Sequence, residues 1–293
     1  MSFISYLLNG VSLGSVYAII ALGYTMVYGI AKMLNFAHGD VIMVGSYVAF
    51  VTINNMGLPI PVSILLSVIV CTVLGVVIEG VAYRPLRHAS KLAVLITAIG
   101  VSYFLQNMAL LIFGANTKSF TSVVPLAALS LAGGQLNISG ETIVTILACL
   151  VIMAGLMAFI KYSKAGHAML AVSEDDGAAR LMGINVNRTI SLTFAIGSAL
   201  AAIAGVLLCS AYPSLTPYTG SMPGIKAFVA AVFGGIGSIP GAFVGGVLLG
   251  IIEILARAYI SSQLSDAIVF SVLIIVLVVR PTGLMGKAIQ EKV

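Results

Sequence analysis

Charged residues that could do chemistry in an apolar environment are few in this chain. Its 293 residues include 14 Lys plus Arg and 9 Asp plus Glu. Those that lie in or beside apolar stretches are Asp40, Glu79, Lys226, Glu253 and Arg257. Glu253 and Arg257 are spaced i,i+4, so we expect them to pair on one helix face as a structural contact. Glu79 lies near the end of its apolar stretch, where we expect its carboxylate to reach water.

Residue patterns of enzymes are missing from the sequence. No GxxxxGK pattern followed by Ser or Thr is present, so we expect no nucleotide hydrolysis by this chain itself. The three His and three Cys lie far apart along the chain, which indicates neither a metal site nor a disulfide framework. No Ser-His-Asp set or carboxylate pair is evident. The sequence therefore predicts a protein that is not an enzyme and has no cofactor of its own.

The composition is that of a membrane protein. Hydrophobic residues make up 60% of the chain and charged residues 8%, whereas soluble domains are roughly 45–50% apolar and about 25% charged. This difference excludes a cytosolic globular protein, a disordered chain and a secreted disulfide module. The formal net charge of +5 is explained by an excess of Lys and Arg in cytoplasmic loops, so no nucleic-acid partner is expected.

Long apolar stretches recur along the whole chain. A hydrocarbon core of about 30 Å needs about 20 helical residues, and continuous apolar runs favour helices over β-barrel strands. We predict an all-α, polytopic transmembrane helical bundle with about eight or nine crossings, in a single domain covering residues 1–293. The expected helices are 3–30, 41–53, 62–83, 92–113, 142–160, 189–211, 225–236, 241–259 and 267–279. Of these, 41–53 and 225–236 are short for a full crossing.

Basic residues predict which loops face the cytoplasm. Lys and Arg cluster in the loops 84–91 and 161–188 and in the tail, which contains Arg280, Lys287 and Lys292. The loop 114–141 has one basic residue, Lys118, and the loop 212–222 has none. Because Lys and Arg mark cytoplasmic loops, we expect the first group inside and the second outside.

Small residues at four-residue spacing predict close helix packing. They are Gly10 with Gly14, the stripe Gly197, Ala201 and Gly205, and the pairs Gly241 with Gly245 and Gly246 with Gly250. Such faces let helix backbones approach closely in lipid, although a Gly-rich chain also produces some pairs by chance.

The loop 161–188 is the most informative polar segment. Ser173, followed by Asp176, predicts a helix N-cap with acidic support. Residues 178–182 are good helix formers, and Gly183 is a typical residue to end a helix. We expect a short amphipathic helix here, parallel to the membrane on its cytoplasmic face, as a docking element.

Two segments, 35–45 and 223–241, each follow a long apolar stretch and carry Gly beside polar residues. Broken helices in both halves of a chain indicate an internal two-fold repeat with a transport pathway at its interface. Broken or re-entrant helices would present N-terminal N–H groups to a substrate carboxylate. The expected pathway residues are Asn35, His38, Gly39, Pro223, Gly224 and Gly235. The alternative is that these breaks are packing or loop features.

Five motifs resemble one family of membrane proteins. They are Asn9–Ala18, Leu34–Asp40, Gly183–Arg188, Gly234–Gly241 and Arg280–Leu284. Together they are similar to the branched-chain amino-acid ABC-importer permeases of the LivH type, over almost the whole chain. Ala178-Ala179 followed by Gly183 also resembles the coupling motif of ABC-importer permeases, although Gly177 stands where that family usually has an acidic residue.

The resemblance implies a membrane-spanning subunit for uptake of Leu, Ile and Val in a bacterial or archaeal cell (inner) membrane. It implies a second permease subunit, two ATPase subunits that bind the ATP, and an extracytoplasmic solute-binding protein. It also implies that the loop 161–188 contacts the ATPase through Glu174, Gly177, Ala178, Ala179, Arg180 and Gly183.

Other functions stay open from the sequence. Relatives in the wider family carry other amino acids, urea or short amides. An ion-coupled carrier or a channel would need ionisable groups at mid-membrane or a selectivity filter, and the sequence shows neither clearly.

Overall fold

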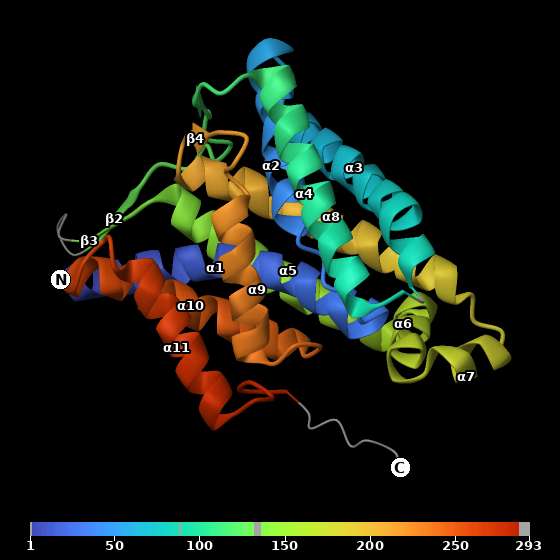
Figure 1. The fold of residues 1–293 in the computed structure, drawn as a ribbon. Helices are drawn as coiled ribbons and strands as arrows, with labels where there is room; N and C mark the ends of the chain where they lie inside the picture. The colour runs from blue at the N-terminus through green and yellow to red at the C-terminus, as the bar shows by residue number, and fades with distance from the viewer. Residues whose placement is uncertain (1, 88, 132–135, 287–293) are drawn as a thin grey trace.

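The computed structural model describes residues 2–87, 89–131 and 136–286, and the chain is almost wholly helical over these ranges (Figure 1). His88, Lys287 and Lys292 lie outside the described residues. The helices are α1 (Ser2–Ala31), α2 (His38–Phe50), α3 (Ile60–Ile78), α4 (Lys91–Phe113), α5 (Gly140–Tyr162), α6 (Lys164–Glu174), α7 (Asp176–Leu181), α8 (Val186–Ala211), α9 (Ser221–Gly234), α10 (Ile239–Tyr259) and α11 (Ser265–Val279).

Shorter elements complete the fold. The π-helical turns Val51–Asn55 and Glu79–Tyr83 extend α2 and α3, and the 3-10 turn Arg84–Leu86 follows the second. The strands are β1 (Lys118–Ser119), β2 (Leu129–Leu131), β3 (Leu136–Ile138) and β4 (Ser214–Leu215).

Six helices in the described part of the chain are long and apolar enough to cross a membrane. They are Phe3–Ala31, Ile60–Leu86, Lys91–Phe113, Gly140–Tyr162, Val186–Ala211 and Ile239–Tyr259. α9 and α11 are shorter apolar helices. The predicted all-α bundle with several membrane-length helices is confirmed.

α1 and α8 form the centre of the bundle. In their most apolar stretches 89% and 72% of residues are buried, compared with 11% in α4 and 17% in α5. α1 packs mainly against α10, and α8 packs against α3, α1 and α2. The outer helices expose large apolar side chains, among them Leu111, Val151 and Val278. Lipid tails are as apolar as these side chains, so the exposed faces are stable in a membrane.

The small-residue faces predicted from the sequence lie at helix contacts. A Cβ atom added to Gly14 would lie 2.6 Å from the carbonyl oxygen of Val247, and one added to Gly250 would lie 2.1 Å from the backbone nitrogen of Gly14. Figure 1 shows α10 running beside α1. A Cβ atom added to Gly205 of α8 would lie 2.5 Å from the carbonyl oxygen of Ile42 on α2. A side chain at these positions would force the helices apart, so the close packing depends on glycine.

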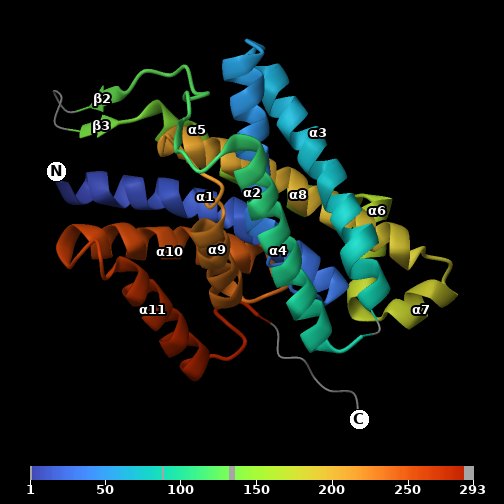
Figure 2. The same cartoon turned by 45° about the horizontal axis from the view of Figure 1, so that its top comes forward.

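The bundle has two distinct ends (Figures 1 and 2). α6 and α7 lie at one end, which we call the α7 end, whereas the N-terminus of α1 and the β2–β3 hairpin lie at the opposite end (Figure 2). β1 pairs antiparallel with β4, with Lys118 opposite Leu215. The loops 114–141 and 212–222, which were expected outside because they contain a single basic residue between them, are therefore joined to one another.

Candidate functional site

The first turns of α2 and α9 meet inside the bundle, and we call this contact the α2–α9 junction. A Cβ atom added to Gly220 would lie 1.7 Å from the carbonyl oxygen of Gly39, and one added to Gly224 would lie 2.8 Å from the Cα atom of Gly39. The His38 ring packs against Tyr24 with ring centroids 4.6 Å apart. Because Tyr24 lies about two turns before the end of α1, two helix N-termini converge within the depth of the bundle.

Polar side chains from three helices surround the α2–α9 junction. Asp40, in the first turn of α2, is 2% exposed. Its Oδ1 accepts a hydrogen bond from Nε2 of Gln106 on α4 at 2.9 Å, and the same Nε2 donates to Oγ of Ser221 on α9 at 3.2 Å. Helix N-termini carry partial positive charge. The Asp40 carboxylate therefore offsets positive charge from α2, and Gln106 links it to α9.

Five of the six predicted pathway residues lie at or next to this junction. His38 and Gly39 begin α2, and Pro223 and Gly224 lie in the first turn of α9. Asn35 lies in the connection before α2, where it is buried and accepts a hydrogen bond from the Tyr83 hydroxyl at 2.9 Å.

Gly235 lies apart from the other five, at the opposite end of α9. Its φ of 107° is one that glycine adopts readily and other residues rarely. A Cβ atom there would lie 2.3 Å from the backbone nitrogen of Gly286. The N–H of Met285 also donates to the carbonyl oxygen of Gly234 at 2.9 Å. Gly235 thus holds the segment that follows α11 against the break between α9 and α10.

The loop 161–188 contains more helix than the sequence predicts. Residues 164–174 form α6, and the short helix expected near residues 178–182 is confirmed as α7. The predicted cap is wrong. Ser173 Oγ donates to the carbonyl oxygen of Leu170 at 2.7 Å because α6 continues through Glu174. The N-cap of α7 is instead Asp175, whose Oδ1 accepts a hydrogen bond from the N–H of Ala178 at 2.9 Å.

Gly183 ends α7 as predicted. Its φ is 83°, its N–H donates to the carbonyl oxygen of Arg180 at 3.0 Å, and the N–H of Ile184 donates to that of Ala179 at 3.0 Å. These two bonds form a Schellman motif, which needs a left-handed residue at this position. α8 begins at Val186 with Asn185 as its N-cap. The connection between α7 and α8 is therefore short and ordered.

The residues implied as ATPase contacts are mostly exposed on this segment. Glu174, Gly177, Ala178, Arg180 and Gly183 are exposed, whereas Ala179 is only 3% exposed. Two further apolar side chains of the segment, Leu181 and Met182, are 90% and 82% exposed. Exposed apolar side chains next to polar ones at a bundle end are typical of a surface that another protein covers.

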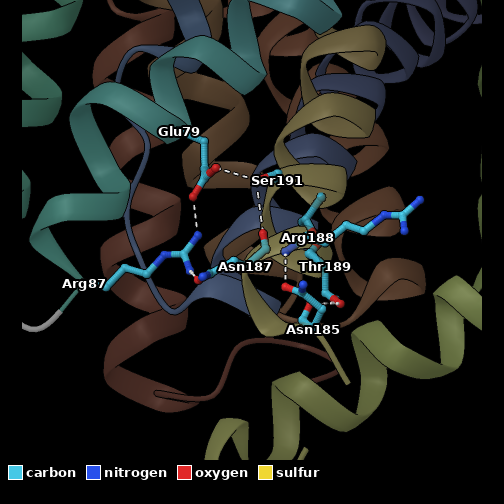
Figure 3. Close-up of polar contacts among 8 residues, drawn as sticks. Glu79, Arg87, Asn185, Asn187, Arg188, Thr189 and Ser191 are labelled. Atoms are coloured by element: carbon cyan, nitrogen blue, oxygen red, sulfur yellow. Dashed lines mark hydrogen bonds and ion pairs between the residues drawn. The ribbon is translucent and has the colours of Figure 1, made fainter. Parts of the chain in front are cut away.

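Glu79 does not reach water, contrary to the expectation from the sequence. It is 1% exposed and pairs with Arg87, which folds back from the 3-10 turn after α3 (Figure 3). Its other oxygen accepts a hydrogen bond from Ser191 of α8, and Arg87 donates to Asn187 (Figure 3). These polar contacts tie the end of α3 to the first turns of α8.

An open groove lies beside this network. It has a volume of about 570 Å³, and we call it the arginine groove. Its lining residues are Arg84, Arg87, Arg180, Gly183, Ile184, Asn185, Val186 and Asn187. The groove therefore joins the α3–α4 connection to α7 and to the N-terminus of α8.

A buried charge cluster connects α1, α9, α10 and α11. Glu253 is fully buried, and its carboxylate accepts hydrogen bonds from Lys226 Nζ at 2.8 Å and from the Tyr17 hydroxyl at 2.9 Å. Arg257 pairs with Glu253 as predicted. Lys226 also pairs with Asp266 at 2.7 Å. Every charge in the cluster has a partner of opposite sign, which supports a structural role.

Comparison with known proteins identifies the family. The family model described as branched-chain amino acid transport system / permease component matches residues 6–277. The chain belongs to this permease family. As a permease component, it has no ATPase activity of its own and is a multi-pass protein of the bacterial inner membrane. The resemblance inferred from the sequence motifs is therefore confirmed.

Relatives of the permease match over almost its full length. It is 47% identical to the high-affinity branched-chain amino acid transport system permease protein LivH of Salmonella typhimurium, over 99% of this chain and 98% of the relative. It is 46% identical to the corresponding protein BraD of Pseudomonas aeruginosa, with the same coverage. The autoinducer 2 import system permease protein LsrD of Escherichia coli is 27% identical over 93% of this chain and 83% of the relative. No solved structure matches the permease.

Sequence reasoning missed Gln106, Ser221 and the arginine groove. Gln106 lies in the apolar helix α4 and donates to Asp40, and an amide side chain inside such a helix is a signal that could have been used. The groove forms between segments separated by about a hundred residues, so no local pattern indicates it.

Proposed function

We propose that this permease is the membrane-spanning subunit of an ABC importer for the branched-chain amino acids Leu, Ile and Val. It works with a second permease subunit, two ATPase subunits and an extracytoplasmic solute-binding protein. The relatives at 46–47% identity support the substrate class. The α2–α9 junction is the structural observation on which the mechanism rests.

The α2–α9 junction is the proposed point of the pathway at which the carboxylate and ammonium groups of the substrate are recognised. Most N–H groups of these two first turns are already bonded to backbone carbonyls, so it is the partial positive charge of the two helix N-termini that favours the carboxylate of the substrate. Asp40 is a complementary acceptor for the ammonium group of the same substrate. Gly39 and Gly220 are in backbone contact, so the pathway is closed at this point, and opening it requires α2 and α9 to separate.

An inverted internal repeat accounts for the convergence of α2 and α9. α1 packs on α10 as α8 packs on α3, and α2 contacts α8 as α9 contacts α1. The pairing pattern supports a two-fold relation between α1–α4 and α8–α11. In that relation α2 and α9 are equivalent broken helices, and their N-termini meet at the axis.

Residues 174–183, which include α7, are the proposed ATPase contact, on the cytoplasmic side. α7 is joined to α8 by a short ordered connection, and α8 packs against α1, α2 and α3 in the centre of the bundle. A displacement of α7 by a moving ATPase subunit would therefore be passed to α8, which contacts α2 through Gly205. Such a rigid-body transmission needs a continuous packed path, and these helices supply it.

Proline at Gly183 is expected to uncouple ATP hydrolysis from transport. Proline fixes φ near −65° and removes the N–H, so it cannot adopt the φ of 83° or make the bond to Arg180. The Gly183→Pro complex should lose roughly tenfold or more of its uptake while its ATPase activity persists. Labelled leucine uptake and phosphate release, measured in proteoliposomes holding the full complex, test this.

Gly114→Pro is the matched control. Gly114 has a φ of 77°, its N–H donates to Leu110, and its surroundings are as open as those of Gly183, but it follows α4 at the opposite end. Equal losses in the two variants, or unchanged coupled uptake in Gly183→Pro, would contradict the role of α7.

In the same assay, unlabelled Ile and Val should compete with leucine, whereas urea and short amides should not. Uptake driven by an ion gradient without ATP would contradict the proposed function itself.

A further inference from the structure

The arginine groove carries more positive charge than its surroundings neutralise. Its lining contains three Arg and no acidic residue. Arg84 is exposed and forms no ion pair within the described ranges 2–87, 89–131 and 136–286. Arg180 lies 3.5 Å from Asp176, but both side chains are more than half exposed, so this pair contributes little.

Arg87 and the start of α8 add to the positive potential. The Arg87 side chain is 10% exposed, and although it pairs with Glu79, its Nε has no acceptor among the described residues. Val186 and Asn187 are the first residues of α8, a helix of 26 residues. Their N–H groups lie in the unbonded first turn, where the helix dipole favours an anion. The groove is therefore suited to a carboxylate or another oxyanion.

The position of the groove indicates what closes it. Arg180 of α7 and Gly183, which follows α7, both line the groove. The two residues between them, Leu181 and Met182, are 90% and 82% exposed. A protein that covers these two apolar side chains also covers the groove. Covering guanidinium groups without an acceptor would remove them from water at a large cost. The covering surface must therefore bring an acceptor with it.

We propose that the arginine groove receives an acidic side chain, Asp or Glu, from the ATPase subunit that covers α7. This inference rests on the proposed function, and it adds the chemistry of the partner surface. A carboxylate can bind a guanidinium through two parallel N–H···O bonds, and Arg84 and Arg180 both line the groove. The permease then presents the apolar side chains of Leu181 and Met182 next to the cationic groove. The ATPase subunit presents an apolar surface next to an Asp or Glu side chain.

A phospholipid headgroup is the other anion that could enter such a groove. It would neutralise the arginines, but it would leave Leu181 and Met182 uncovered. The protein carboxylate explains the apolar and the basic halves of this surface together, and the lipid explains only the basic half.

Charge reversal tests the proposal in the assembled membrane subunits. The two permease subunits are reconstituted in nanodiscs of neutral phosphatidylcholine, and the affinity of the purified ATPase subunit is measured over a range of salt concentrations. Arg84→Glu and Arg180→Glu should each weaken binding roughly tenfold or more at low salt. Lys164→Glu is the matched control, since Lys164 is an exposed cation of α6 outside the groove lining, and it should change affinity by no more than about twofold.

A second variant separates this inference from the proposed function. Leu181→Asp acts on the apolar contact and should weaken binding whether or not a carboxylate enters the groove. If Leu181→Asp weakens binding and both Arg variants bind like Lys164→Glu, the ATPase docks on α7 and the carboxylate proposal is wrong. If Leu181→Asp also has no effect, the docking role of α7 itself is wrong.

Lipid analysis distinguishes a lipid headgroup from a protein carboxylate as the anion in the groove. The nanodiscs are repeated with a fraction of phosphatidylglycerol, and co-purified anionic lipid is quantified by mass spectrometry. Loss of bound anionic lipid in Arg84→Glu with unchanged ATPase affinity would overturn the proposal and assign the groove to a headgroup. Weakened ATPase binding in neutral nanodiscs, which contain no anionic lipid, would support it.

Discussion

Leucine in place of Glu253 is expected to lower the free energy of unfolding of the permease by about 3–5 kcal/mol. The carboxylate is fully buried and accepts hydrogen bonds from Lys226 and Tyr17 as well as from Arg257. Its removal leaves the 4%-exposed Lys226 with Asp266 alone, and leaves the Tyr17 hydroxyl without its acceptor. Thermal unfolding of the purified subunit in detergent, followed by circular dichroism, should show a clearly lower Tm.

The double variant Lys226→Met with Glu253→Leu distinguishes a broken charge pair from a simple packing defect. Removing both charges leaves no buried ammonium that lacks its partner, so part of the lost stability should return. Asp176→Leu is a suitable control, because the Asp176 side chain is 62% exposed and its loss should hardly change Tm. A Glu253→Leu variant as stable as wild type would show that the cluster is not a stabilising contact.

Leucine in place of Gly39 is expected to abolish uptake. Even a Cβ atom at Gly39 would lie 2.7 Å from the carbonyl oxygen of Gly220, and this atom belongs to backbone that cannot rotate away. The first turns of α2 and α9 would be forced apart at the point where they converge. Under the proposed function, uptake of labelled leucine by proteoliposomes containing the complex should fall roughly a hundredfold or more, as expected for misplacement of binding groups by about 1 Å.

Assembly must be measured in the same samples. Gly39→Leu should still co-purify with its partner subunits, because the α7 end lies away from the α2–α9 junction (Figure 2). Gly100→Leu is the matched control. Gly100 is a glycine of α4 with no atom within 4 Å of an added Cβ, so the same substitution there should leave uptake close to that of wild type. Normal uptake by Gly39→Leu would remove the junction from the pathway.

The sequence predicts the helices well because membrane insertion depends on local composition. A stretch of about 20 apolar residues is a property of neighbouring residues, and every such stretch in this chain is helical. The end of α7 at Gly183 was predictable for the same reason, since a left-handed C-terminal residue is a local requirement.

The sequence predicts less well what depends on distant contacts. Ser173 has the side chain of an N-cap, but whether it caps a helix depends on where α6 ends. The pairing of Arg257 with Glu253 was visible at i,i+4, whereas that of Lys226 required the relative position of α9 and α10. Glu79 was expected in water because the fold of the chain after α3, which returns Arg87 to it, has no local signal.

The packing of α1 on α10 has a consequence for biogenesis. α1 leaves the ribosome before α10, and α10, which fills the glycine face of α1, lies more than two hundred residues later in the chain. At about 5–20 residues per second, the wait is roughly 10–45 seconds. During this interval α1 and the start of α2 have no native neighbours from the second half of the protein. We expect the nascent chain to need a holding partner at the translocon until α8, α9 and α10 have been synthesised.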